Sequence, residues 1–155
     1  MKLAIWVIGK TNFPYLVEGI GLYMSRLKHY AKTEYEELKD VKPAKDEKDT
    51  SRMEADMILQ RLKNDDILIL LDEKGETFDS IGFSRFIEKL QIESTKRVIF
   101  LIGGAFGHHS TLRIRANYSI SLSKMTFSHQ MVRIILLEQL YRAFTIIKNE
   151  KYHNH

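Results

Sequence analysis

Three uninterrupted apolar runs constrain the fold of this chain more than any other feature. They are residues 3–8 (LAIWVI), 67–71 (ILILL) and 98–102 (VIFLI). A strand with one face toward water alternates apolar and polar residues, whereas a strand covered on both faces is apolar throughout. The three runs therefore predict the central strands of a sheet that is buried on both sides.

Amphipathic segments and weaker strand patterns lie between and after these runs. The predicted helices are residues 13–27 with Pro14 near the start, a helix opened by the capping box of Ser51 and Glu54, residues 81–90, and residues 131–147 capped by Ser128. Weaker strands are expected at 33–41 and 119–122, a charged loop at 42–50 and a turn at 73–75. Strands that alternate with helices predict an α/β fold with a mostly parallel sheet flanked by helices.

Composition limits the class of protein. A chain of 155 residues, 44% of them hydrophobic, fits a single domain over residues 1–155 with a sizeable core. The absence of cysteine excludes disulfides and thiolate metal sites and fits a reducing compartment. No apolar run approaches the ~20 residues of a membrane span, and the first ten residues are interpreted as a strand, not a signal peptide. We therefore expect a cytoplasmic protein with no membrane partner.

The carboxyl ends of the strands are the expected ligand site, as in other open parallel sheets. Three such ends stand out, at 71–72, at the glycine segment 103–107 (GGAFG) and at 121–128. The glycine segment matches neither the dinucleotide fingerprint nor the phosphate-binding P-loop. Its glycines do allow a flat ligand to approach the backbone closely, although an ordinary strand-to-helix turn has the same composition.

The histidines predict no metal site. Their spacing contains no HExxH pattern, so the preferred interpretation is exposed loop and tail histidines. No G-x-S-x-G elbow supports a serine hydrolase. The histidines considered are His108, His109, His129, His153 and His155.

Basic and aromatic residues alternate in the last third of the chain, which suits phosphate contacts and base stacking. A solvated helix face with tyrosines packed inside has the same pattern, and the two interpretations remain open. The net charge of +4 permits an anionic partner without requiring one. The residues concerned are Arg113, Arg115, Lys124, Arg133, Arg142, Lys148 and Lys151 with His129, His153, Tyr141 and Tyr152.

Four short segments are each common by themselves, but their order and spacing together are typical of one protein family. They are 102–107 (IGGAFG), 121–130 (SLSKMTFSHQ), 138–143 (EQLYRA) and the closing Tyr152-His153. With them, the length, the MKL start and the LD-x-x-G pattern at 71–75, the whole chain resembles the ribosomal RNA large-subunit methyltransferase H family. These are small SPOUT (trefoil-knotted) methyltransferases. The resemblance implies a C-terminal trefoil knot and a homodimer. It also implies transfer of a methyl group from S-adenosyl-L-methionine to N3 of a pseudouridine in large-subunit rRNA, with the assembled ribosome as the favoured substrate.

The resemblance also implies the site residues. Those expected to bind the cofactor are Leu71, Gly103, Gly104, Gly107, Ser123, Lys124, Met125, Thr126, Phe127 and Ser128. Arg142 is expected to contact RNA phosphate or developing charge, His153 to position the base or remove its proton, and Tyr152 to stack on or orient the base. For Tyr152, a ring that pins the tail onto the domain is the alternative. Asn154 stands where many relatives carry a basic residue, which removes one expected phosphate contact.

Two further functions compete with methyl transfer. One is a ribosome- or RNA-binding protein with the same fold and no transfer activity. The other is a nucleotide-dependent oxidoreductase, against which the missing dinucleotide fingerprint counts. Because so small a chain offers little surface to a ribosome, we also expect the tail of one protomer to complete the site of the other. The last helix carries apolar residues on a second side, which fits either a homodimer or burial within one chain.

Overall fold

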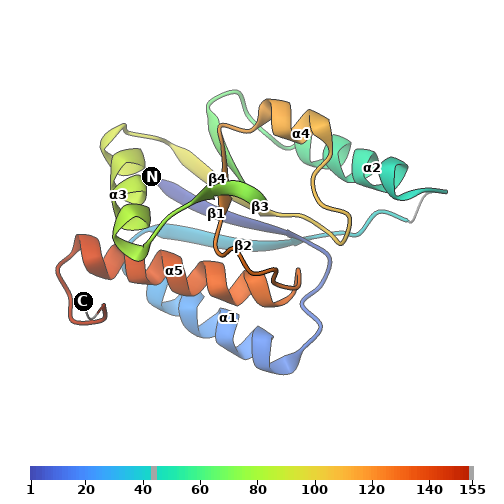
Figure 1. Cartoon of the computed structure of the whole chain (residues 1–155). Coiled ribbons are helices and arrows are strands. Elements are labelled where there is room, and N and C mark those ends of the chain that lie inside the picture. The colour runs from blue at the N-terminus through green and yellow to red at the C-terminus, as the bar shows by residue number, and fades with distance from the viewer. Residues whose placement is uncertain (43–44, 154–155) are drawn as a thin grey trace.

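The computed structural model describes residues 1–42 and 45–153 as a five-stranded, all-parallel sheet with helices on both faces (Figure 1). The strands are β1 (Lys2–Ile8), β2 (Lys32–Leu38), β3 (Asp66–Thr77), β4 (Arg97–Ile102) and β5 (Tyr118–Ser121), in the spatial order β2-β1-β4-β3-β5. The three apolar runs form the three central strands. The predicted α/β fold with a parallel sheet is therefore confirmed.

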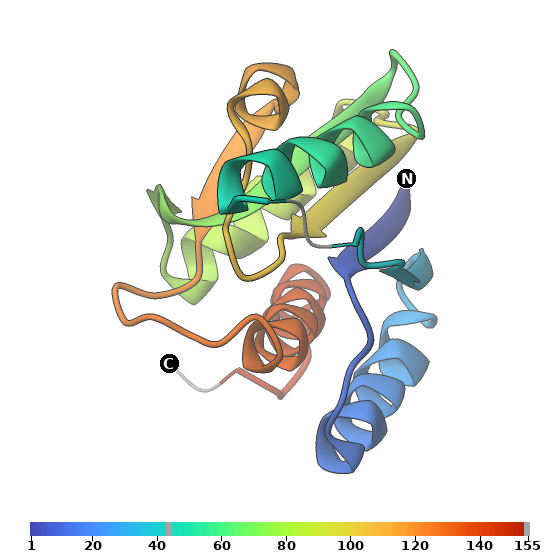
Figure 2. The same cartoon turned by 90° about the vertical axis from the view of Figure 1, so that its right-hand side faces the viewer.

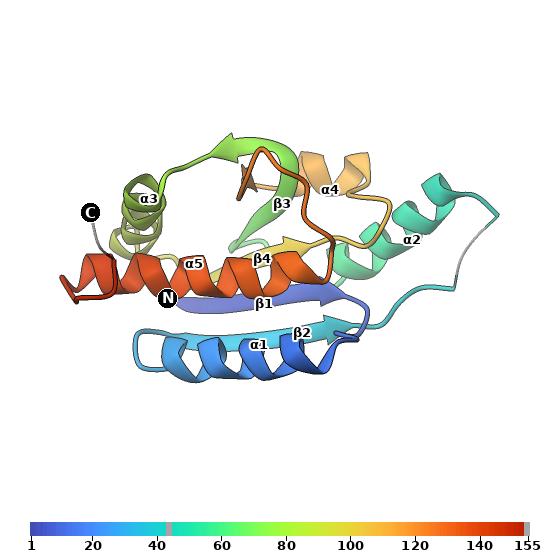
Figure 3. The same ribbon diagram turned by 60° about the horizontal axis from the view of Figure 1, so that its bottom comes forward.

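Two helical layers cover the sheet (Figure 3). The helices are α1 (Pro14–Leu27), α2 (Glu47–Leu59), α3 (Ser80–Ile92), α4 (Ser110–Arg115) and α5 (Met131–Ile147). Side chains of α1, α3 and α5 pack on one face of the sheet, and those of α2 and α4 pack on the other. Alternate residues of each central strand supply the two cores, as the two-residue period of a strand requires.

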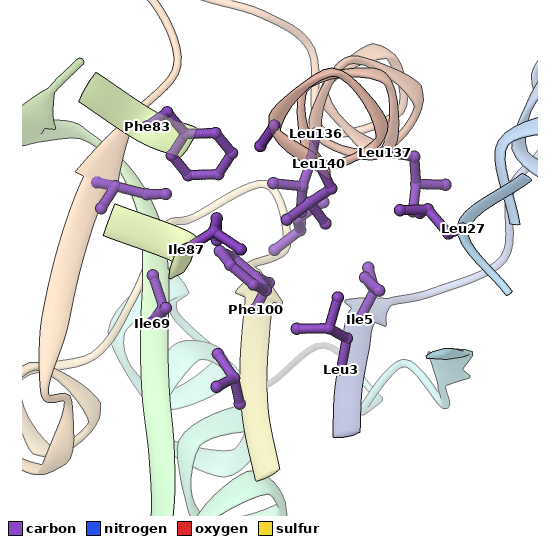
Figure 4. Close-up of a cluster of buried hydrophobic side chains, with 14 of the residues drawn as sticks. Leu3, Ile5, Leu27, Ile69, Phe83, Ile87, Phe100, Leu136, Leu137 and Leu140 are labelled. Atoms are coloured by element: carbon purple, nitrogen blue, oxygen red, sulfur yellow. The ribbon is translucent and has the colours of Figure 1, made fainter. Parts of the chain in front are cut away.

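Helix α5 lies between α1 and α3 and is the centre of the larger core (Figure 4). Leu136 and Leu140 point toward Phe100 of the sheet, while Leu137 points toward Leu27 of α1. Leu137 belongs to the second apolar side of the helix and is fully buried within the chain. At Leu137 this side is therefore covered by the protein's own α1.

The start of α2 differs from the prediction. The helix begins at Glu47 and is capped by Asp46, whose side chain accepts a hydrogen bond from the Asp49 amide at 2.7 Å. Ser51 lies in the second turn and donates to the Lys48 carbonyl, so the predicted capping box is wrong. Carboxylates in a first turn are favoured by the helix dipole, which explains the earlier start. Residues 43–44 of the expected charged loop lie outside the described residues.

The turn expected at 73–75 is also wrong, because β3 continues to Thr77. Its register against β5 shifts, so that Leu71 and Glu76 both pair with Ile120. A Cβ atom on Gly75 would stand 2.6 Å from the Ile120 backbone, so only glycine lets strands β3 and β5 approach this closely. The polar residues and the glycine at 73–75, which predicted a turn, belong instead to a strand with a shifted register.

The sequence pattern missed one short helix, α4, which has a single fully buried apolar residue, Leu112. The weaker strands expected at 33–41 and 119–122 correspond to β2 and β5. The trefoil knot concerns how the segment after β5 threads through the chain, and it stays a prediction.

Candidate functional site

A cavity of about 450 Å³ opens at the carboxyl ends of β3, β4 and β5, the edge that faces the viewer in Figure 2. Three segments line it: residues 71–74 of β3, the loop from Gly103 to His108, and the loop that joins β5 to α5. Specific small-molecule sites occupy clefts of roughly 300–1,000 Å³ at this edge of parallel sheets. The cavity is therefore the candidate ligand site.

The glycine loop forms one wall with its backbone. A Cβ atom on Gly103 would stand 3.0 Å from Cε1 of His108, and a Cβ atom on Gly104 would stand 3.0 Å from a carboxylate oxygen of Glu54. Gly107 has a φ angle of +72°, in the left-handed region that favours glycine. Close packing therefore explains why glycine stands at positions 103 and 104, and the positive φ angle explains why it stands at position 107.

Serine hydroxyls fold the loop between β5 and α5 onto the opposite wall. The Ser123 hydroxyl accepts from the Met125 amide at 2.9 Å, and Ser121 donates to the Ser123 carbonyl at 2.8 Å. The Ser128 hydroxyl accepts from the Met131 amide at 3.1 Å, as the predicted cap requires, although Gln130 is the residue that directly precedes the helix. These local bonds fix a loop that has few apolar contacts of its own.

Most residues expected to bind a cofactor line this cavity together. Those that line it are Leu71, Gly103, Gly104, Gly107, Ser123, Met125, Thr126, Phe127 and Ser128. Lys124 belongs to the same loop but is not among the lining residues, and its side chain is exposed. Nine of the ten residues expected to bind a cofactor thus lie together in one cavity.

An ion pair between Asp72 and Arg113 contributes charge to the lining. Burial alone would raise the pKa of Asp72, but the Lys74 amide, at 3.0 Å, and Arg113 outweigh it and lower this pKa. Asp72 is therefore an anion at neutral pH, held in the wall of the cavity. Sequence reasoning noted Asp72 only as the end of a strand and missed this pair.

The expectation of exposed loop and tail histidines is wrong for His108, His109 and His153, which are all partly buried. His108 lies in the cavity wall with its Nε2 atom 2.9 Å from the Leu71 carbonyl. His109 is the N-cap of α4, where its Nδ1 atom accepts from the Thr111 amide at 3.3 Å. His129 is exposed as expected, and His155 lies outside the described residues.

The three residues expected near the catalytic centre form a second cluster, around Glu138 of α5. Arg142 donates to Glu138 from Nε at 3.1 Å, and its guanidinium lies 4.8 Å from the ring centre of Tyr152. The Tyr152 hydroxyl donates to the same carboxylate at 3.2 Å, and Nδ1 of His153 accepts from Arg142 at 3.3 Å. Glu138 was not singled out from the sequence, although its spacing of four residues before Arg142 is the signal for such a pair.

This tail cluster is remote from the cavity of the same chain. Val132, at the start of α5, lines the cavity, and Arg142 follows ten residues later in the same helix. At ~1.5 Å per residue the two positions are separated by about 15 Å along the axis. Figure 1 shows the segment that follows α5 at the far end of this helix from the loops that line the cavity. One chain alone does not bring the two sets of residues together.

Two arginines expected on an RNA-binding surface have structural roles. Arg133 is fully buried and donates to the carbonyls of Ile8 and Gly9. Arg115 donates to the carbonyls of Lys63 and Asp66. For the fully buried Arg133 the RNA prediction is wrong, and for the partly exposed Arg115 it stays a prediction. Other basic residues of the set are exposed, namely Lys124, Lys148 and Lys151.

Residues 1–42 and 45–153 contain neither a candidate metal-ligand cluster nor a helix that could span a membrane. These residues contain no group of three histidine, aspartate or glutamate side chains placed to hold a metal ion. Within the same residues, none of the helices combines the length and the apolar character needed to cross a bilayer.

Comparison with known proteins defines the class. Residues 1–153 match the family described as predicted SPOUT methyltransferase. Several curated relatives carry the name ribosomal RNA large subunit methyltransferase H. The protein from Cytophaga hutchinsonii is 52% identical over 99% of this chain and 100% of its own length, and that from Parabacteroides distasonis is 46% identical over 99% of both. The Trichlorobacter lovleyi protein is 43% identical over 99% of this chain and 100% of its own length. The chain belongs to the ribosomal RNA large subunit methyltransferase H family of SPOUT methyltransferases.

Proposed function

We propose that this protein transfers a methyl group from S-adenosyl-L-methionine to N3 of a pseudouridine in large-subunit rRNA, on the assembled ribosome in the cytoplasm. The observation that carries the proposal is the cavity at the carboxyl ends of β3, β4 and β5, lined by the segments that carry the family resemblance. The tail cluster supplies the side chains that can act on a nucleotide.

The cavity fits the cofactor in size and in chemistry. Its volume of about 450 Å³ lies within the range of specific small-molecule sites. Backbone amides and carbonyls at Gly103 and Gly104 are accessible because neither residue has a side chain, and they can hydrogen-bond to an adenine edge. When bound, S-adenosyl-L-methionine supplies an electrophilic methyl group on a sulfonium.

The residues of the tail cluster have separate tasks. Arg142 holds a permanent positive charge whose pKa is raised by its bond to Glu138, so it suits RNA phosphate or charge that develops on the base. Burial, and hydrogen bonding and charge from Tyr23 and Glu138, raise the pKa of Tyr152, which therefore keeps its proton and can stack on or orient the base. We assign to His153 the remaining role, which is to position the base or to accept its N3 proton; proton transfer requires that Nδ1 release the hydrogen bond from Arg142.

The separation within one chain leads us to propose a homodimer with composite sites. About 15 Å of helix separates the cavity from the tail cluster of the same protomer. An isologous dimer in which α5 of one protomer runs past the other would bring each tail to the partner's cavity. The contacts between Tyr152, Tyr141 and Glu138 hold the tail on its own α5, where the partner can meet it. The pinning role considered for Tyr152 is thus compatible with a role at the site.

The direct test is transfer of labelled methyl to ribosomes that lack the modification, compared with free large subunits and naked RNA. We expect N3-methylated pseudouridine, mainly on assembled ribosomes. Label on another nucleoside would overturn the proposed target. Absence of both label and cofactor binding would favour the RNA-binding protein without transfer activity.

A mixing experiment tests the composite site. A cavity variant, Gly104→Leu, and a tail variant, Arg142→Ala, are each expected to be inactive. When their subunits are exchanged at equal concentrations, half the dimers are mixed and one of the two sites in each is intact, which restores about a quarter of wild-type activity. No restoration after verified exchange would show that cavity and tail must come from the same chain.

A further inference from the structure

The ring of His108 joins two walls of the cavity. Its Nε2 atom lies 2.9 Å from the Leu71 carbonyl at the end of the β3–β4 ladder, where Leu71 pairs with Ile102, the last residue of β4. The other side of the ring packs against Gly103, because a Cβ atom there would stand 3.0 Å from Cε1 and 3.2 Å from Nδ1. The side chain thus continues the link between β3 and β4 beyond the end of the backbone ladder.

The hydrogen bond defines which ring nitrogen carries a proton. A carbonyl only accepts, so Nε2 must donate, and in the neutral ring Nδ1 is then without a proton. Nδ1 lies on the side of the ring that faces the Gly103 backbone. A second proton, on Nδ1, would place a positive charge on a ring held between the Leu71 carbonyl and the Gly103 backbone.

We propose that His108 is a positioning residue of the cofactor cavity, which in its neutral form fixes β3 at Leu71, where the β3–β4 ladder ends, against the glycine loop. This inference rests on the proposed function, since it assumes that S-adenosyl-L-methionine binds between these walls. Both residues that the ring touches, Leu71 and Gly103, line the cavity. A change in their spacing therefore alters the width available to the cofactor.

The charged groups that face the ring are Asp72 of β3 and Arg113 of α4, which pair with one another. Burial lowers the pKa of His108 and outweighs the opposite effects of the Leu71 carbonyl and Asp72, while Arg113 lowers it further. Protonation therefore disfavours the arrangement seen here. Stability and cofactor affinity that depend on the neutral ring are present above the ordinary histidine pKa of ~6.5 and are lost as the pH falls below it.

Calorimetric titration of S-adenosyl-L-methionine into the full-length protein, from pH 5.5 to 8, tests this role. Three variants are compared with wild type: His108→Leu, which loses the donor; His108→Gln, which keeps an N–H donor and does not titrate; and His29→Gln, an exposed control in the turn between α1 and β2. Methyl transfer to unmodified ribosomes at pH 8 gives kcat and the KM for S-adenosyl-L-methionine separately. Thermal unfolding checks that each variant is folded.

We expect His108→Leu to raise the cofactor Kd about 10-fold at pH 8, roughly one lost hydrogen bond, with a smaller change in kcat. His108→Gln should remain within about 3-fold of wild type at pH 8 and lose the weakening that wild type and His29→Gln show at low pH. Wild-type affinity in folded His108→Leu, or a flat wild-type profile between pH 5.5 and 8, would overturn the inference. Failure of wild type to bind the cofactor at any pH would instead refute the proposed function.

Discussion

Replacing Arg133 by methionine removes a buried cation that holds the segment before α5 against the end of β1. The guanidinium is 0% exposed and donates four hydrogen bonds. Its acceptors are the Ile8 carbonyl at 2.8 Å, the Gly9 and His129 carbonyls at 3.0 Å each, and the Thr11 hydroxyl at 2.9 Å. No salt bridge to this arginine is found among the described residues. Backbone carbonyls therefore provide most of the compensation for the buried charge.

The magnitude follows from these acceptors. Each carbonyl left without a donor costs about 1–3 kcal/mol when it is buried, and the bonds to Ile8 and Gly9 are both buried. Methionine fills part of the volume and removes the cost of burying a guanidinium. We therefore expect a net loss of about 3–5 kcal/mol in the free energy of unfolding, within the sum of about 2–6 kcal/mol for the two buried carbonyls. Arg133→Lys should lose less, because an ammonium keeps three donors.

Urea unfolding at fixed protein concentration measures this loss. With a slope of about 2 kcal/mol per molar urea, the expected change lowers the midpoint by roughly 2 M. Lys89→Met is the matched control, because Lys89 forms only an exposed pair with Glu93 and should change stability by less than ~0.5 kcal/mol. A midpoint shift below about 0.5 M for Arg133→Met would refute the reasoning. So would a reduced salt dependence of RNA binding in folded Arg133→Met, since that would place the Arg133 side chain on phosphate.

Three further changes have defined outcomes. Gly103→Ala places a Cβ atom 3.0 Å from the His108 ring and should raise the cofactor Kd about 10-fold with little loss of stability, and unchanged calorimetric affinity would contradict the packing argument. Ser128→Ala removes the hydroxyl that accepts from the first amide of α5 and should cost about 1 kcal/mol, seen as a lower melting temperature, whereas Ser128→Thr should retain most of it. Burial would raise the pKa of Asp66, but its bonds from Arg97 and a backbone amide lower it, so its contribution to stability is present above pH ~4 and is lost as the pH falls further. Asp66→Asn should therefore be less stable than wild type at pH 7, and the difference should shrink toward pH 2; an equal difference at both pH values would show that the charge is irrelevant.

The cavity was accessible to sequence reasoning because its walls are continuous segments. Residues 102–107 and 121–130 each fold locally, through glycine geometry and serine hydroxyl bonds, and each lies at the end of a strong strand signal. The order of parallel strands then places both at one edge of the sheet. Motif order, strand ends and local capping were sufficient to name nine residues of the lining, but not His108, Arg113 or Val132.

The partners of charged side chains were not accessible in this way. Arg133 and Arg142 look alike in sequence, yet one is buried against β1 and the other lies in the tail cluster with Glu138. His108 was expected in solvent, yet its ring joins two walls of the cavity. The environment of each side chain depends on groups that are distant in the sequence. A sequence pattern does not show which of these groups lie nearby in the folded protein.

By itself, then, the sequence determined the strands, the alternation with helices and the location of the ligand edge. Hydrophobic periodicity and turn preferences act over a few neighbouring residues, so they can be read directly from the sequence. The tertiary structure alone decided that β3 passes beyond the expected turn, since Gly75 matters only where Ile120 approaches it. It also decided that the tail cluster lies about 15 Å of helix away from the cavity. Side-chain partners and distances between sites arise only when remote segments pack together, because burial and hydrogen bonding depend on what lies nearby in space.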